Sequence, residues 1–187
     1  MESTLNDNGG DLSFSEDFRK RVTTNLENHP TVTHDGHDLR KAAVAIAIAP
    51  LENGQSGFIL TRRGKNLKTH SYQYALPGGK IDEGETQEET VLREVQEEVG
   101  IQANRENIVG YLDDYITRSG FMITPIVLWT PNLEDLRPEP GEVDDISKYT
   151  SPLKLFDYLA VGKMIITSDL EVLREIINSI NYSNSYL

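Results

Sequence analysis

The sequence predicts an α+β fold in which helices cover a mixed β-sheet. Residues 43–49 (AVAIAIA) form a near-continuous apolar run, which is typical of a strand buried on both faces. Residues 86–99 carry apolar side chains with the period of a helix. The predicted elements follow one another as strand, strand, helix, strand, strand, helix, and this order suits a sheet with helices packed on it.

The N-terminal part is predicted to hold one helix. Residues 1–13 are polar, with Asn, Gly and Asp clustered, and are expected to be disordered or loosely attached. Ser15 is a suitable helix N-cap, because three apolar residues follow it at a spacing of four. Residues 29–38 form a polar connector. Its histidines lack an accompanying carboxylate pattern, so a solvated loop is favoured over a metal site; they are His29, His34 and His37.

The run at 43–49 is predicted to form a hairpin with the next strand. Asn53-Gly54 is typical of a tight turn, and Gly57–Thr61 returns as the second strand. A short apolar piece at 73–76 follows. It ends at Pro77-Gly78-Gly79, whose glycines allow a close approach of the backbone.

The helix at 86–99 has recognisable ends. Thr86 is a suitable N-cap, and Glu89 three residues later completes a capping box. Gly100 is the residue type expected just past a helix end. Two strands then follow, joined through Ser119-Gly120, and a proline-rich acidic loop precedes two more helices. The ranges predicted for these are Ile108–Ile116 and Met122–Trp129 for the strands, Pro131–Glu142 for the loop, and Ser151–Leu159 and Leu170–Ile180 for the helices.

No internal repeat or interdomain linker interrupts the chain, so residues 14–187 are predicted to form a single domain. The absence of cysteine excludes disulfides and thiolate metal sites. No apolar run approaches the roughly 20 residues needed to span a bilayer, and the polar start is unlike a signal peptide. We therefore expect a cytoplasmic protein without a membrane partner. The net charge of −12 argues against nucleic-acid binding.

Acidic residues concentrate around the helix at 86–99. Residues 79–101 contain eight acidic residues and only two basic ones, Lys80 and Arg93. Their net charge of −6 is half of the net charge of −12 of the whole chain. Glu94 and Glu98 lie about 40° apart on one helix face and about 6 Å apart along its axis, with Glu97 beside them. Like charges at this spacing destabilise an isolated helix.

A hard cation would explain the gathered carboxylates. Mg²⁺ prefers oxygen ligands and commonly shares its site with substrate phosphate. The backbone carbonyls of Gly78 and Gly79 lie just upstream as further candidate ligands. Arg93 is placed where it can pair with Glu85 and hold the loop against the helix.

The stretch from Gly79 to Ile101, with Glu85 and the run Arg93-Glu94-Val95-Gln96-Glu97-Glu98-Val99-Gly100, resembles the Nudix box at every fixed position. The resemblance implies a Nudix-type α/β/α sandwich with a loop–helix–loop catalytic motif. It also implies a hydrolase that cleaves a nucleoside diphosphate linked to another group, with Mg²⁺ as cofactor and Mn²⁺ as the alternative. By resemblance, the metal ligands are Glu94, Glu97, Glu98 and the carbonyl of Gly79, and Glu85 with Arg93 forms a structural brace.

The general base has two candidate locations. Nudix enzymes differ in whether a glutamate of the box or one from a downstream loop takes the proton. Glu94 or Glu97 is the first choice here, and Glu142 is the alternative.

A second resemblance concerns the substrate. The stretch from Leu60 to Gln73, followed by Leu76-Pro77-Gly78-Gly79, is similar to the motif of the coenzyme A diphosphatase branch, with departures at Lys68, Tyr72 and Leu76. Its cations are the basic cluster that leads into the acidic site, and a ligand with several phosphates needs such counter-charges. The candidate substrate-binding residues are Arg62, Arg63, Lys65, Lys68 and His70.

The resemblance implies hydrolysis of coenzyme A or a derivative to 3′,5′-ADP and 4′-phosphopantetheine. A second enzyme hypothesis is hydrolysis of ADP-ribose, a dinucleoside polyphosphate or another nucleotide adduct. A third is a binding module that senses nucleotides without cleaving them, although no box glutamate is missing here. The expected partner is a small nucleotide-type substrate, and the chain is expected to be a monomer or homodimer.

Overall fold

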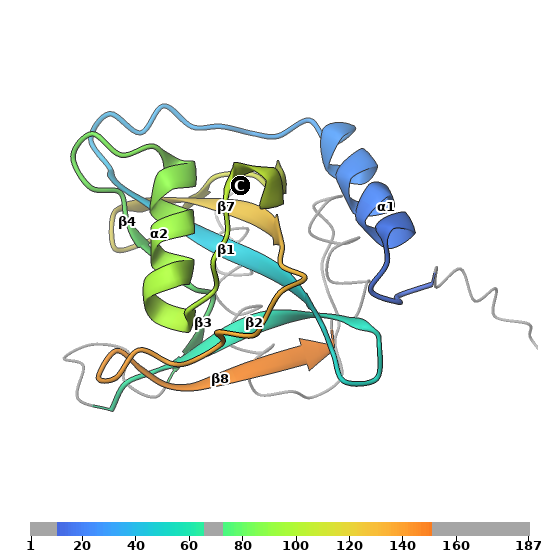
Figure 1. Ribbon diagram of the computed structural model, residues 1–187. Coiled ribbons are helices and arrows are strands. Elements are labelled where there is room, and N and C mark those ends of the chain that lie inside the picture. Colours follow the sequence, from blue (N-terminus) through green and yellow to red (C-terminus); the bar gives the residue numbers. More distant parts are fainter. Residues whose placement is uncertain (1–10, 66–72, 151–187) are drawn as a thin grey trace, which may run out of the picture.

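The computed structural model describes residues 11–65 and 73–150, and within them the chain folds around one mixed β-sheet (Figure 1). The helices are α1 (Glu16–Glu27), α2 (Gln87–Val99) and the short 3-10 helix η1 (Arg105–Asn107). The strands are β1 (Arg40–Pro50), β2 (Ser56–Arg63), β3 (Tyr74–Ala75), β4 (Gly78–Lys80), β5 (Ile108–Tyr111), β6 (Tyr115–Ile116), β7 (Phe121–Trp129) and β8 (Val143–Thr150).

The sheet is mixed because β1 and β7 run parallel while all other pairs of strands are antiparallel. β1 lies at the centre, with β7 along one side and β2 and β4 along the other. The predicted hairpin of β1 and β2 is confirmed, since Ile48 pairs with Phe58 and Pro50 with Ser56. The expectation of a mixed sheet is therefore also confirmed.

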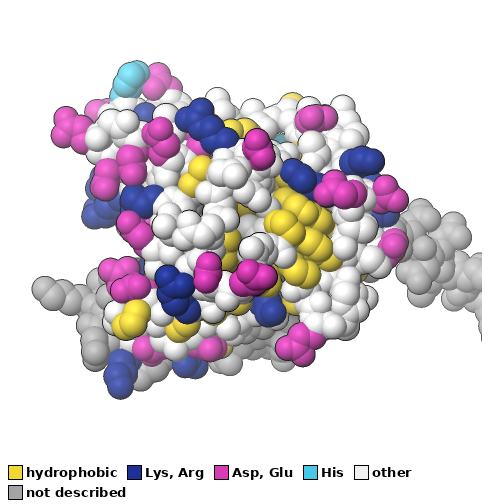
Figure 2. All heavy atoms as spheres, in the orientation of Figure 1, with side chains coloured by type: hydrophobic (Ala, Val, Ile, Leu, Met, Phe, Trp, Pro, Cys, Tyr) yellow, Lys and Arg dark blue, Asp and Glu magenta, His cyan; other side chains and the backbone are white. Residues whose placement is uncertain are grey.

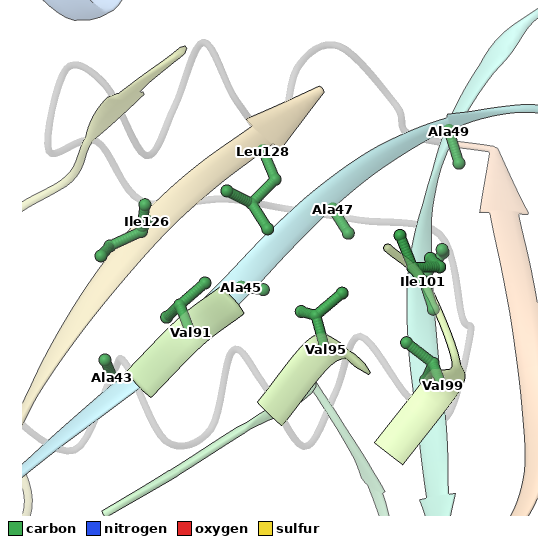
Figure 3. Packing of buried hydrophobic residues seen from close by; sticks show 11 residues of the cluster. Ala43, Ala45, Ala47, Ala49, Val91, Val95, Val99, Ile101, Ile126 and Leu128 are labelled. Atoms are coloured by element: carbon green, nitrogen blue, oxygen red, sulfur yellow. The ribbon is translucent and has the colours of Figure 1, made fainter. Parts of the chain in front are cut away.

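The continuous apolar run of β1 serves two cores, one on each face of the sheet. Its alternate alanines, Ala43, Ala45, Ala47 and Ala49, are fully buried beneath α2. Figure 3 shows Val91, Val95 and Val99 of α2 facing these alanines, with Ile126 and Leu128 of β7 beside them. The small methyl groups allow the helix to pack close to the strand.

The opposite face of β1 presents Ile46 and Ile48, which pack with Trp129 and with Phe18 of α1. Because α1 and α2 contribute to different cores on the two faces, the fold is the α/β/α sandwich expected from the resemblance (Figure 1).

The first helix begins where the sequence predicts. The Ser15 hydroxyl accepts a hydrogen bond from the amide of Phe18, and the Phe14 ring stacks on Trp129 with 4.1 Å between ring centroids. The segment before it is more firmly attached than expected. The carbonyl of Leu12 accepts from the amide of Ser56, so the loosely attached N-terminus does not extend to residue 13.

Both predicted ends of α2 are confirmed. The Thr86 hydroxyl accepts from the amide of Glu89, and the Glu89 carboxylate accepts from the amide of Thr86. Gly100 ends the helix with φ of +76°, a left-handed conformation that a residue with a side chain adopts at a cost.

The strand expected at 108–116 is divided into β5 and β6. Asp113 and Asp114 interrupt it, because the backbone amide of Asp114 donates to the carbonyl of Val32 at 3.0 Å instead of continuing the ladder, and both carboxylates bind the same connector before β1. Asp113 accepts from the amide of Val32 at 2.8 Å and Asp114 from the amide of His34 at 3.1 Å.

β8 was not predicted from the sequence. It pairs along β2 from Gly57 to Arg63, and its charged residues hide the apolar alternation by which a strand is usually recognised. The proline-rich loop at 131–142 is confirmed as lacking helix and strand. Residues 1–10 and the two helices expected at 151–159 and 170–180 lie outside the described residues.

The histidines of the connector do not gather. The His29 imidazole lies 3.1 Å from an Asp113 carboxylate oxygen, and His37 lies 3.0 Å from Asp35. Across residues 11–65 and 73–150, no helix is long and apolar enough to cross a membrane.

Candidate active site

The candidate site is built on the face of α2 that turns toward β4. Val91, Val95 and Val99 anchor the helix to the sheet on the neighbouring face, and this packing fixes the orientation of the glutamates between them. Glu98 is only 8% exposed, and the Glu94 side chain is 15% exposed. Two carboxylates removed from water to this degree need a compensating positive group.

Gly78 and Gly79 lie directly against these two carboxylates. The amide of Gly78 donates to Glu98 Oε2 at 3.2 Å. A side chain on Gly79 would collide with the Glu94 carboxylate, since its Cβ would lie 2.6 Å from Glu94 Cδ. β4 pairs with β1 through Ala43 opposite Gly79, so the glycines are held in place by the sheet. The absence of a side chain at Gly79 is what makes room for Glu94.

Arg93 connects the loop before α2 to the helix. Its Nε and Nη2 atoms donate to the two oxygens of Glu85 at 2.8 and 3.1 Å, a bidentate arrangement. Nη1 donates to Glu94 Oε1 at 2.8 Å and Glu97 Oε2 at 3.0 Å, and Nη2 also reaches the Lys80 carbonyl at 3.4 Å. All five N–H groups of the guanidinium therefore have acceptors in the protein.

These contacts shift the acidities of the carboxyls in opposite directions. Hydrogen bonds from Arg93, and then from Thr90, lower the pKa of Glu85 to about 2. Burial raises the pKa of Glu98 to about 7, although the amide of Gly78 opposes this shift. Burial likewise raises the pKa of Glu94, and the hydrogen bond from Arg93 counteracts part of the effect.

Glu97 is placed differently from the other two box glutamates. Its side chain is 57% exposed and is directed to Arg93. Among the described residues, no three acidic or histidine side chains converge in a metal-binding arrangement. The structure brings Glu94 and Glu98 together over Gly78-Gly79, and a rotation of the exposed Glu97 side chain would be needed to add it to them.

The loop at 131–142 docks on the C-terminal end of α2. The amide of Arg137 donates to the carbonyl of Val99 at 3.0 Å, and the amide of Glu139 to that of Glu98 at 3.1 Å. These bonds satisfy carbonyls that a helix end otherwise leaves without partners. Figure 1 shows the loop running from beneath α2 to the end of β2.

The far end of this loop is clamped to β2. The amide of Gly64 donates to the carbonyl of Glu142 at 2.7 Å, and a Cβ on Gly64 would lie 2.5 Å from the carbonyl oxygen of Gly141. Glu142 thereby lies near enough to Glu94 and Glu98 that its charge, added to their burial, helps to raise the pKa of both. Gly64 lies in the stretch that resembles the coenzyme A diphosphatase motif, but its close contact with Gly141 was not predicted from the sequence.

A comparison with known proteins places this chain in a family. The family model described as the NUDIX domain matches residues 41–166, which is more than half of the sequence. The chain belongs to the Nudix family.

Similar proteins with Nudix names include "Nudix hydrolase 3" of Caenorhabditis elegans and "Nudix hydrolase 22, chloroplastic" of Arabidopsis thaliana. The first is 32% identical over 149 residues, covering 75% of this chain and 61% of the relative. The second is 30% identical over 158 residues, covering 78% and 52%. This Nudix chain therefore spans about half the length of the curated relatives it matches.

Solved structures support the Nudix fold. A MutT/nudix family protein of Enterococcus faecalis superposes with a TM-score of 0.53 at 19% identity, covering 60% of this chain and 44% of that one. The NUDIX domain of Shewanella oneidensis NrtR, in a cocrystal with ADP ribose, superposes with a TM-score of 0.51 at 18% identity, covering 78% and 88%. At this identity the likeness shows the fold alone.

Of the basic residues expected to bind substrate, Arg62 and Arg63 lie at the end of β2. Arg62 and Arg63 are half-buried, and the Nε atom of each is buried without a hydrogen-bond partner among the described residues. Arg63 is near enough to Glu98 for its charge to oppose the rise in the pKa of that residue, which burial causes. Lys65 is exposed, whereas Lys68, His70 and Tyr72 lie outside the described residues.

Acidic charge is not confined to the Nudix helix. Figure 2 shows acidic side chains scattered among basic ones over one face of the molecule, with hydrophobic side chains gathered in a patch. A cation at the site would therefore be held by the placement of Glu94 and Glu98 rather than by a uniquely acidic surface.

Proposed function

We propose that this chain is a metal-dependent pyrophosphohydrolase that cleaves a nucleoside diphosphate linked to another group. The observation that carries the proposal is the burial of Glu94 and Glu98 side by side over Gly78-Gly79, with the Glu94 carboxylate occupying the space a Gly79 side chain would fill. The buried carboxylate oxygens lie next to the backbone of Gly78-Gly79, and such a set of oxygen ligands suits a hard divalent cation such as Mg²⁺, with Mn²⁺ as the alternative.

Each residue of the site has a role in this proposal. Glu94, Glu98 and the carbonyl of Gly79 would hold the cation, and Glu97 would join them after leaving Arg93. The cation would supply Lewis acidity and lower the pKa of a water molecule. The Arg93–Glu85 pair holds the loop 80–85 against α2 and so fixes the spacing of the ligands. The proton is taken by Glu94 or Glu97, or by Glu142 from the docked loop.

We further propose coenzyme A or a derivative as the substrate. The similarity of residues 60–79 to the coenzyme A diphosphatase motif supports this choice, and so does the pair of half-buried arginines beside the acidic cluster. Arginine guanidinium groups can bind phosphate oxygens bidentately, so Arg62 and Arg63 are the candidates at the end of β2 for contact with the substrate phosphates. The cytoplasmic location and the monomeric or dimeric state stay predictions.

The products of the reaction test the substrate. Purified protein is incubated with Mg²⁺ and either coenzyme A or ADP-ribose, and the products are separated by chromatography. Release of 3′,5′-ADP and 4′-phosphopantetheine supports coenzyme A. Absence of turnover there, together with AMP from ADP-ribose, would leave the pyrophosphate chemistry standing and refute the choice of substrate.

The variant Glu98→Gln tests the site itself. Turnover should fall by several orders of magnitude, because a metal ion supplies several kcal/mol of transition-state stabilisation and about 1.4 kcal/mol corresponds to a factor of ten. The fold should persist, since glutamine keeps the shape of the side chain and can still accept from the Gly78 amide. The exposed Glu83→Gln, outside the cluster, is the matched control. Unchanged turnover in Glu98→Gln contradicts the assignment.

A further inference from the structure

A polar recess adjoins the site on the outer side of α2. It has a volume of about 350 Å³ and is lined by Arg93, Gln96, Glu97, Gln102, Arg137 and Glu139. Arg93 and Glu97 belong to the candidate active site, and the other four residues come from the end of α2, the residues just after it and the docked loop. The recess therefore opens directly beside Glu97.

Three side chains of this recess, Arg137, Gln96 and Gln102, have polar groups that are available to a ligand. Every N–H group of Arg93 already has an acceptor. Arg137 makes a single side-chain hydrogen bond, from Nη1 to the carbonyl of Asp135 at 3.3 Å, within the residues the structure describes. The side-chain carboxamide groups of Gln96 and Gln102 have no hydrogen-bond partner among the described residues. Arg137 is thus the cation of the recess whose donors are free for an anion.

The position of Arg137 is fixed by the backbone. Its amide is bonded to the Val99 carbonyl, and its side-chain stem lies over Gly100, where a Cβ would be 3.1 Å from Arg137 Cγ. Because the stem of Arg137 is held against the end of α2, the side chain has less conformational freedom to lose when its guanidinium binds an anion.

We propose that Arg137 binds an anionic phosphate of the substrate in this recess, which is lined by neither Arg62 nor Arg63. This inference rests on the proposed function and extends it. A pyrophosphate-linked substrate has two halves that must leave the cluster in different directions. The β2 arginines receive one half and the recess receives the other. Gln96 and Gln102 offer neutral hydrogen bonds to the same half.

The variant Arg137→Gln tests the proposal. Glutamine keeps most of the stem over Gly100 and removes the charge. KM should rise about ten- to a hundredfold, the loss expected for a charge-assisted hydrogen bond, while kcat stays within about threefold. Arg137→Lys should recover part of the affinity. Arg105→Ala is the control, because Arg105 is exposed on η1, away from the recess.

The choice of substrates identifies which phosphate is bound. An increase in KM for coenzyme A, dephospho-coenzyme A and ADP-ribose alike assigns Arg137 to the diphosphate. An increase confined to coenzyme A assigns it to the phosphate on the sugar. If Arg137→Gln leaves KM unchanged for every one of the three substrates that the wild-type protein turns over, the proposal is overturned.

A binding measurement separates failure of this proposal from failure of the proposed function. Calorimetric titration with ADP and Mg²⁺ does not depend on turnover. Weaker binding of ADP by Arg137→Gln than by wild type supports the phosphate contact even if none of the substrates is cleaved. Equal affinity of the two proteins for ADP, with no cleavage by either, counts against both proposals.

Discussion

Replacing Gly79 by alanine should damage the chemistry of the site while leaving the fold nearly intact. The added Cβ would lie 2.6 Å from Glu94 Cδ and closer still to Glu94 Oε1, against 3.4 Å for an ordinary contact, so the carboxylate has to retreat by more than about 0.8 Å. Misplacement of a reacting or coordinating group by roughly 1 Å costs about 100-fold in rate. We therefore expect kcat to fall by about 100-fold.

The effect on stability should be small because two contributions oppose each other. Forcing the Glu94 side chain off its rotamer costs about 0.5–1.5 kcal/mol. Gly79 has an ordinary backbone conformation, so alanine there also restricts the unfolded chain, which stabilises the protein by about 0.4–1 kcal/mol. The net change is within about 1 kcal/mol, which corresponds to about 2–4 °C in Tm for a chain of this size.

Gly78→Ala is the contrasting variant. A Cβ on Gly78 would lie 2.7 Å from the Cα atom of Val44 and would also press on the carbonyl of Ala43, both of which are backbone groups of β1. Gly78 also has φ of +154°, which disfavours a side chain. Gly78→Ala should therefore lose both stability and activity.

The assay combines steady-state kinetics, titration with Mg²⁺ and thermal melting followed by circular dichroism, using whichever substrate the wild type cleaves fastest. Gly79→Ala should show reduced kcat, a weaker response to Mg²⁺ and a Tm close to that of the wild type. Wild-type activity in Gly79→Ala would refute the reasoning, since it would mean that the Glu94 carboxylate can move away from Gly79 without consequence.

Two further predictions concern the parts that support the site. Glu85→Gln should destabilise the protein at neutral pH. The contacts with Arg93 and Thr90 lower the pKa of Glu85 to about 2 in the folded state, against about 4.3 in the unfolded chain. The ionised carboxylate therefore stabilises the folded state above about pH 4.3, and this stabilisation is lost as the pH falls toward 2. Urea denaturation at pH 7 and pH 3 should show the difference between wild type and variant shrinking at the lower pH, and a constant difference would contradict the linkage. Ala45→Leu overpacks the space under α2 and should cost about 1–3 kcal/mol, lowering the urea midpoint, whereas the exposed Val32→Leu should be neutral.

The parts of the fold that were predicted correctly are those encoded by neighbouring residues. The caps of α2 depend on Thr86, Glu89 and Gly100 alone, and the apolar run of β1 is visible in seven consecutive residues. The proximity of Glu94 and Glu98 follows from helical geometry in the same way. The pairing of Arg93 with Glu85 also lies within nine residues of sequence.

The features that were missed depend on contacts between distant residues. Within the described residues β8 is an edge strand, and charged residues such as Asp144, Asp145 and Lys148 are typical of such strands. Its half-buried Ile146 gains its partners only when β2 lies beside it. The break between β5 and β6 arises because Asp113 and Asp114 bind a segment about 80 residues away.

The same distinction separates the chemistry of the site from its selectivity. The carboxylates proposed to bind the metal, Glu94 and Glu98, lie on one helix and contact one dipeptide, Gly78-Gly79. One candidate contact to the substrate, Arg137, belongs to the loop at 131–142, which is bonded to α2 through the amides of Arg137 and Glu139 and to Gly64 at the end of β2. Backbone hydrogen bonds and the packing of Leu133 and Leu136 against the core hold this loop, so its exposed side chains can change without disturbing Glu94 and Glu98. Changes in the loop should therefore alter which substrate is bound, whereas changes in the helix should alter whether any substrate is cleaved.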